Sequence, residues 1–138
     1  MTEIETRLRA SFARQTMMQT LGASMDEAAE GRVVISAPIA PHVLQQQGAA
    51  HAGLAFSLGD SAAGYAALSV LPEGAEVVTV EMKINLLSPA VGDRLVAEGR
   101  VIRPGRRIVA VASDVFAEGP KGRKHIATML GTMVPVEG

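Results

Sequence analysis

Apolar side chains recur at helical spacing at the start of the chain, with charged residues on the other sides of the helical wheel. The repeat consists of Ile4, Leu8, Phe12 and either Gln15 or Met18. Residues three and four apart share one face of a helix, so this pattern predicts a short amphipathic helix that ends at Gly22. We expect a loop over residues 24–30. Residues 32–39 then predict a first strand, which prolines end.

A long stretch almost without charge follows. The forty residues 33–72 contain one formally charged side chain, Asp60. Their second half, residues 53–68, is apolar nearly all round, which is typical of a helix covered on several sides. The apolar run over residues 52–71 has the length of a membrane span, but Asp60 and the glycines argue against one. We therefore predict a buried helix in a soluble protein, ended by a Pro-Glu-Gly break at residues 72–74.

Four stretches with strand character fill the remainder of the chain: residues 78–86, 94–103, 107–117 and 124–134. In the first, apolar and polar residues alternate from Val78 to Leu86, so one face of that strand should be apolar throughout. Turns rich in proline and glycine separate the four, so we expect consecutive strands to be antiparallel neighbours in a meander. The order of elements predicts an α+β fold: one domain over residues 1–138, with an antiparallel sheet curled around a central helix.

Composition excludes several classes of protein. The chain has no cysteine, which excludes disulfides, thiolate metal sites and a cysteine nucleophile. Thirteen basic residues against 14 acidic ones, with 3% aromatics, argue against a nucleic-acid partner. No signal-peptide pattern, metal-ligand spacing, hydrolase triad motif or phosphate loop is present. We expect a cytoplasmic protein that uses no metal and no cofactor and has no membrane partner.

Asp60 is the first candidate for chemistry, because an ionised carboxylate in an apolar helix is unfavourable unless it is hydrogen-bonded or functional. The alternative is that it lies on an exposed stripe or caps a nearby loop. Upstream, residues 45–53 form a polar loop leading into the helix, whose free N–H groups can hold an anion or an oxyanion. His51 lies nine residues before Asp60, about 2.5 helical turns. The two need not meet within one helix, so joint action would involve two chains.

These residues resemble a known family. His51-Ala-Gly53, Asp60 nine residues after the histidine, and residues 80–89 (VEMKINLLSP) are similar to the hotdog-fold acyl-CoA thioesterases of the PaaI-like group. The resemblance covers residues 21–134. It implies the hotdog fold, hydrolysis of an acyl-CoA thioester without a cofactor, and a site shared between two subunits.

The resemblance also implies roles for single residues. Asp60 would be the nucleophile, or the general base for water. The N–H of Ala52, at the start of the helix with Gly53, would polarise the carbonyl, although Ala replaces the usual Gly and would disfavour a positive φ. Gln45 matches a polar side chain that holds the water or the carboxylate, and Thr79 matches a strand hydroxyl with the same task. His51 would support the start of the helix and the thioester oxygen, or be an ordinary loop histidine.

A basic excess in residues 100–124 offers a place for coenzyme A phosphates. Our preferred candidates are Arg103, Arg106 and Arg107, which flank one Pro-Gly turn. The alternative is that they are solvated charges that protect a strand edge.

Two further functions stay open. One is dehydration or hydration of a 3-hydroxyacyl thioester by His51 and Asp60, although the hallmark segments of hotdog dehydratases are missing. The other is a module that binds acyl-CoA without catalysis. The apolar helix and a two-faced sheet also predict at least a homodimer, and we expect a homotetramer.

Overall fold

The computed structural model describes residues 1–137. Its elements are α1 (Glu3–Phe12), α2 (Thr16–Leu21), β1 (Ser24–Ala29), β2 (Arg32–Pro38), the 3-10 turn η1 (Pro41–Val43), α3 (Ala52–Ser69), β3 (Ala75–Leu86), β4 (Arg94–Arg103), β5 (Val109–Gly119) and β6 (Gly122–Glu137). In this part of the chain no helix is both long and apolar enough to cross a bilayer.

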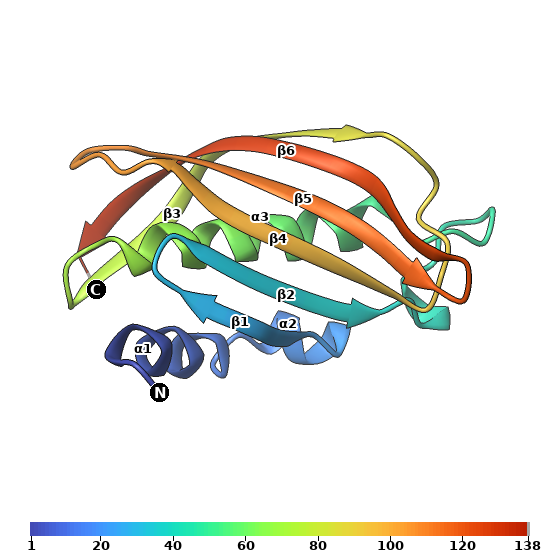
Figure 1. Ribbon diagram of the computed structural model, residues 1–138, viewed down its shortest axis with the longest axis horizontal. Coiled ribbons are helices and arrows are strands. Elements are labelled where there is room, and N and C mark those ends of the chain that lie inside the picture. The colour runs from blue at the N-terminus through green and yellow to red at the C-terminus, as the bar shows by residue number, and fades with distance from the viewer. Residues whose placement is uncertain (138) are drawn as a thin grey trace.

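One antiparallel sheet curves around the long helix α3 (Figure 1). Its strand order is β1-β2-β4-β5-β6-β3, and α1 and α2 lie beside β1 at one edge. The prediction of an antiparallel sheet around a central helix is confirmed, and the predicted helix over residues 53–68 differs from α3 by one residue at each end. Eleven of the 18 residues of α3 are buried, as its apolar composition indicates.

The predicted four-strand meander is wrong in its first step. β4, β5 and β6 are consecutive neighbours, but β3 pairs with β6 at the edge of the sheet, and β4 lies between β2 and β5. Residues 87–93 are not a hairpin turn, because other parts of the chain bind their backbone. Leu87 N donates to Ile126 O at 2.8 Å, and Asp93 N to Glu118 O at 2.7 Å. The segment therefore crosses the end of the sheet.

The N-terminal prediction also needs correction. The segment predicted as a single helix forms two helices, α1 and α2. They are separated at Gln15, whose backbone is extended and whose side chain binds Tyr65. Gly22 ends the second helix as predicted, with a left-handed φ of 68°. Residues 24–29 form strand β1 rather than a loop. Met25 is its one buried residue, so the strand has no alternating apolar signal to reveal it.

A bulge in β3 overturns the predicted apolar face of that strand. Thr79 pairs with Met133 and Glu81 pairs with Thr132, which leaves Val80 as an extra residue. Met82 therefore packs against the core while Val80 is 60% exposed. The same bulge lets Thr79 face α3 on the side that Met82 occupies, although an unbroken alternation would put them on opposite faces. The bulge thus positions a side chain at the site described next.

Glycine brings the sheet very close to α3. A Cβ at Gly99 of β4 would lie 2.5 Å from Ala62 O and from Ala63 N, both in the helix backbone. Ser113 of β5, which is fully buried, donates from Oγ to Gly59 O at 2.6 Å. These contacts fix α3 against the middle of the sheet, with the opposite side of the helix facing β3 and α1.

Candidate functional site

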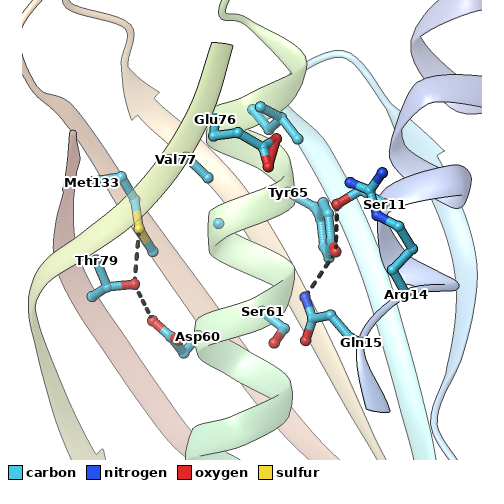
Figure 2. A pocket seen from close by; sticks show the side chains of 12 residues that line it. Ser11, Arg14, Gln15, Asp60, Ser61, Tyr65, Glu76, Val77, Thr79 and Met133 are labelled. Atoms are coloured by element: carbon cyan, nitrogen blue, oxygen red, sulfur yellow. Dashed lines mark hydrogen bonds between the residues drawn. The ribbon is translucent and has the colours of Figure 1, made fainter. Parts of the chain in front are cut away.

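Asp60 lies in a pocket of about 390 Å³ over the exposed side of α3 (Figure 2). The helix provides its floor, β3 one wall and the α1–α2 segment the other. The lining residues are Ser11, Arg14, Gln15, Asp60, Ser61, Gly64, Tyr65, Leu68, Glu76, Val77, Thr79 and Met133. The single charge of the 33–72 stretch therefore lies at a cavity on the exposed side of the helix.

The Asp60 carboxylate is held on one side. Thr79 Oγ1 donates to Asp60 Oδ1 at 2.7 Å and also contacts Met133 Sδ at 3.1 Å (Figure 2). Within residues 1–137, Asp60 has no ion pair, and Oδ2 accepts no hydrogen bond. A carboxylate with one oxygen fixed and the other free can accept a proton or attack an electrophile in a defined direction.

A hydrogen-bonded group forms the wall opposite β3. Tyr65 Oη binds Ser11 Oγ at 3.0 Å and accepts from Gln15 Nε2 at 2.8 Å. Phe12 packs edge-on against the Tyr65 ring, with centroids 6.1 Å apart. These contacts tie the junction of α1 and α2 to the central helix, so this wall is fixed rather than a loose loop.

The start of α3 forms a second feature. His51 is the N-cap, and its Nδ1 accepts from Gly53 N at 2.8 Å, which requires that Nδ1 carry no proton. The N–H of Gly53 is thereby occupied. The N–H of Ala52 has no partner among the described residues, and it points out of the first turn. No non-glycine residue in the described chain has positive φ, so alanine at position 52 is unstrained.

Gln45 belongs to the loop that leads into α3. Its Oε1 accepts from the N–H groups of Gln47 and Ala49, at 2.5 and 3.3 Å, so its carbonyl closes the loop. Gln45, His51 and Ala52 line a wide pocket of about 880 Å³ with residues 86–91 of the crossing segment. The side chain is therefore a positioning group for the loop, and only its NH₂ faces outward without a partner in the described chain.

The predicted site residues thus fall into two groups. Asp60 and Thr79 share one pocket, while Gln45, His51 and Ala52 line the other, and Gly53 follows Ala52 in the first turn of α3. Nine residues of helix rise about 13.5 Å, so the Asp60 carboxylate and His51 of one chain do not act on the same atom.

The predicted phosphate ligands lie at the end of α3 remote from His51. Arg103 ends β4, and Arg106 and Arg107 follow in the hairpin to β5. Arg106 lines a third pocket beside the C-terminal end of α3. Among residues 1–137 these three form no ion pair, whereas Arg100 and Arg123 bind carboxylates on the outer face of the sheet. None of the three lines the Asp60 pocket.

A separate charged cluster lies on that outer face, opposite the Ser113 side chain. Burial alone would raise the pKa of Asp114, but hydrogen bonds from Arg100 and Thr128, and the charges of Arg100 and His125, hold it below its ordinary value of 3.8. The Arg100 and His125 contacts are 2.7 and 3.0 Å. No group of three His, Asp or Glu that could hold a metal occurs among the described residues.

A comparison with known protein families assigns the chain to one of them. The sequence profile of the thioesterase superfamily matches residues 47–123, which include α3 with Asp60 and the strands β3, β4 and β5. The chain belongs to the thioesterase superfamily.

Relatives of this thioesterase-superfamily protein agree with the assignment. A protein of Saccharolobus solfataricus that carries an esterase name is 33% identical over 100 residues, which is 72% of this chain and 71% of that one. The crystal structure of a thioesterase family protein from Silicibacter pomeroyi has a TM-score of 0.95 and 40% identity, covering 98% of this chain and 99% of that one. Together they support thioester hydrolysis as the activity.

Two more distant structures confirm the hotdog fold. The PaaI protein from the phenylacetic acid degradation operon of E. coli has a TM-score of 0.86 at 24% identity, covering 98% of this chain and 94% of that one. A Bacillus halodurans protein, whose structure was solved with CoA, has a TM-score of 0.78 at 24% identity, covering 96% and 85%.

Sequence reasoning missed the wall that α1 and α2 contribute to this thioesterase-fold pocket. Ser11, Gln15 and Tyr65 were not candidates, nor was Glu76 at the end of the groove. One signal was present. Gln15 occupies a place in the helical repeat that is otherwise apolar, and a polar residue there indicates a buried polar partner.

Proposed function

We propose that the protein hydrolyses an acyl-CoA thioester to the free acid and coenzyme A, with Asp60 as the catalytic carboxylate. The observation that carries the proposal is the single carboxylate in the apolar stretch, oriented by Thr79 and open on its other oxygen beside a pocket. Membership of the thioesterase superfamily supports the reaction type. The Bacillus halodurans structure with CoA supports the choice of thiol.

Two routes fit this geometry. In one, Asp60 takes a proton from water, whose oxygen attacks the thioester carbonyl. In the other, an oxygen of Asp60 attacks the carbonyl itself, and water then hydrolyses the resulting anhydride. Both expel the thiolate of coenzyme A, which takes up a proton, and both give the free acid. Where water opens the anhydride at Cγ of Asp60, a single turnover in H₂¹⁸O distinguishes the two routes. The first product then carries an unlabelled oxygen from Asp60 and the label enters the Asp60 carboxylate, whereas direct attack of water labels the first product.

We propose that the N–H of Ala52 stabilises the oxyanion in either route. An N–H in the first turn of a helix combines a free donor with the positive end of the helix dipole. His51 fixes this turn through Gly53, and Gln45 fixes the loop before it, so both act by positioning. Hydrolysis of a thioester needs few further catalytic groups, because the thioester carbonyl has weak resonance stabilisation.

A second copy of the chain would bring the two halves of the site together. Within one chain the Ala52 N–H and the Asp60 carboxylate belong to different pockets. The edge strand β3, which carries Thr79, exposes Val78, Val80 and Leu86 at 47, 60 and 57%. Unpaired edges with exposed apolar residues favour association. We propose at least a homodimer, and a homotetramer as the full assembly.

Arg103, Arg106 and Arg107 are our proposed ligands for the coenzyme A phosphates. Their charges are not used by carboxylates in the part of the chain that the structure describes, so they are available to an anion. Guanidinium groups suit phosphate because they donate two parallel hydrogen bonds.

Thiol release from a set of acyl-CoAs, aromatic, short and long, tests the proposal with Asp60→Asn. This variant keeps the volume and the hydrogen bond from Thr79 but removes basicity and nucleophilicity, so hydrolysis should be nearly lost. The matched control is Asp93→Asn, an exposed aspartate outside both pockets. Retention of more than about a tenth of kcat, a barrier change under roughly 1.4 kcal/mol, refutes the assignment.

The same assay separates the other functions. Loss of water from a 3-hydroxyacyl-CoA would identify a dehydratase, and saturable binding without turnover would identify a binding module. Sedimentation as a stable monomer of 14.4 kDa at micromolar concentration would exclude the shared site.

A further inference from the structure

Two glycines in the middle of α3 have different explanations. Glycine destabilises a helix interior, so each needs a reason. A Cβ at Gly59 would overlap the sulfur of the buried Met129, so a side chain there would displace part of the packing against the sheet. A Cβ at Gly64 would meet only Met133 Cε, at 3.8 Å, which is ordinary contact distance. Packing therefore leaves room for a side chain at Gly64.

That room is part of the Asp60 pocket. Gly64 lies four residues after Asp60, and Leu68 eight residues after, so the three occupy successive turns on the floor of the groove. Val77 and Thr79 stand on one side, and the segment tied to Tyr65 stands on the other (Figure 2). The absence of a side chain at Gly64 deepens the groove one turn beyond the carboxylate.

We propose that the acyl group of the substrate lies in this groove over Gly64, and that Gly64 determines how large an acyl group is accepted. This inference rests on the proposed function, since it places the thioester carbonyl at Asp60. An acyl group that extends from there along the helix meets Gly64 after about 6 Å and Leu68 after about 12 Å, at 1.5 Å a residue.

These dimensions define a substrate class. A 12 Å groove holds about nine bonds of extended chain, taking 3.8 Å for three bonds as in the peptide backbone. The pocket volume of about 390 Å³ is near the lower end of the range for small-molecule sites. Glu76, Arg14 and Gln15 make the rim polar, which disfavours a longer alkyl chain. The class is medium-sized acyl groups, of about eight to ten carbons or one ring.

Substitutions at Gly64 test the inference by filling the groove without disturbing the core. We would measure kcat/KM of the full-length protein and of Gly64→Ala and Gly64→Leu with acetyl-, butyryl-, octanoyl- and palmitoyl-CoA. The wild type should prefer octanoyl-CoA. In Gly64→Leu, kcat/KM for octanoyl-CoA should fall at least tenfold further than for acetyl-CoA, with an intermediate effect in Gly64→Ala. Ala10→Leu, which adds the same side chain to an exposed position of α1, is the control and should leave the ratio unchanged.

Thermal unfolding shows whether the fold needs glycine at position 64 for packing or has space there for a side chain. Gly64→Ala should unfold at the same temperature as the wild type or higher, because alanine favours a helix and meets only ordinary contacts. A large fall in its Tm would show that packing requires this glycine and would overturn the inference. So would an unchanged ratio of octanoyl- to acetyl-CoA hydrolysis in Gly64→Leu, or a wild-type preference for palmitoyl-CoA. Failure of the proposed function looks different: no thioester is hydrolysed, or Asp60→Asn remains active.

Discussion

Thr79 offers a direct test of how the site is oriented. Thr79→Val keeps the β-branched shape and removes the hydroxyl that donates to Asp60 Oδ1 at 2.7 Å. The carboxylate then loses its one hydrogen bond within the described residues, so its free oxygen is no longer held toward the groove. We expect kcat to fall while KM changes little, because the lost interaction directs the reacting group rather than binding the substrate.

The magnitude follows from the kind of hydrogen bond. Hydrogen bonds to charged groups are worth roughly 1.5–3 kcal/mol, and water competes at an exposed position such as Thr79, so about 1–2 kcal/mol is expected here. At 1.36 kcal/mol for each tenfold change in rate, kcat should fall about 5- to 30-fold. Thr79→Ser keeps the hydroxyl and should stay within about threefold of the wild type.

The same pair of strands contains a matched control. Thr132 Oγ1 donates to Glu81 Oε1 at 2.8 Å, which is also a threonine bound to a carboxylate, but on the outer face of the sheet. Thr132→Val should therefore leave kcat unchanged, with a Tm close to that of Thr79→Val. Equal kcat values for the two valine variants would refute the assignment of Thr79 as the residue that orients Asp60. Equal damage in Thr79→Ser would refute it as well.

Three further outcomes are expected. Gly99→Ala should lower the free energy of unfolding by about 3 kcal/mol or more, because its Cβ would overlap the backbone of α3. Denaturant titration measures this change, and a value under about 1 kcal/mol would contradict the close packing of β4 on α3. Because the pKa of Asp114 is lowered, its ionised form stabilises the fold above about pH 4, and this contribution is lost as the pH falls through the folded-state pKa. Asp114→Asn, which weakens the Arg100 contact, should thus lower Tm at pH 7 and matter much less near pH 2; an equal loss at both would show that the charge is unimportant. Arg106→Ala and Arg107→Ala should raise KM for an acyl-CoA and leave kcat unchanged, and neither variant should change the kinetics with an acyl-pantetheine. KM of the wild type for an acyl-CoA should rise with salt concentration. An unchanged KM in both variants would mean that these arginines are only solvated charges at a strand edge.

The sequence predicted the central helix and its carboxylate because both depend on local composition. Residues 53–68 are apolar nearly all round, which is typical of a helix covered on several sides, and Asp60 is the one charge among them. The family resemblance then supplied the hotdog fold, which the strand stretches alone did not specify. The resemblance also named Thr79 as a hydroxyl that holds the carboxylate or the water, but the bulge through which Thr79 reaches Asp60 has no signal in the residue types.

What could not be predicted depends on contacts between distant parts of the chain. The edge position of β3 follows from backbone hydrogen bonds that hold residues 87–93 away from a hairpin, and nothing in their composition distinguishes the two outcomes. β1 is a strand because it borders β2 across a turn at Gly31, whose φ is 77°. The Tyr65 contact with Gln15 joins residues fifty positions apart, and only the folded chain brings them together.

The position of α3 in the chain has a consequence for the order of folding. Strands β3 to β6, which cover much of α3 and include Gly99, Ser113 and Met129, are all C-terminal to the helix. At the usual rate of about 5–20 residues a second, a ribosome needs several seconds to complete the strands after residue 69. During that time an 18-residue, mostly apolar segment has only the α1–α2 segment and the β1–β2 hairpin beside it. Nascent chains that stop before β6 should therefore need chaperones and aggregate without them, even though the complete protein buries most of this helix.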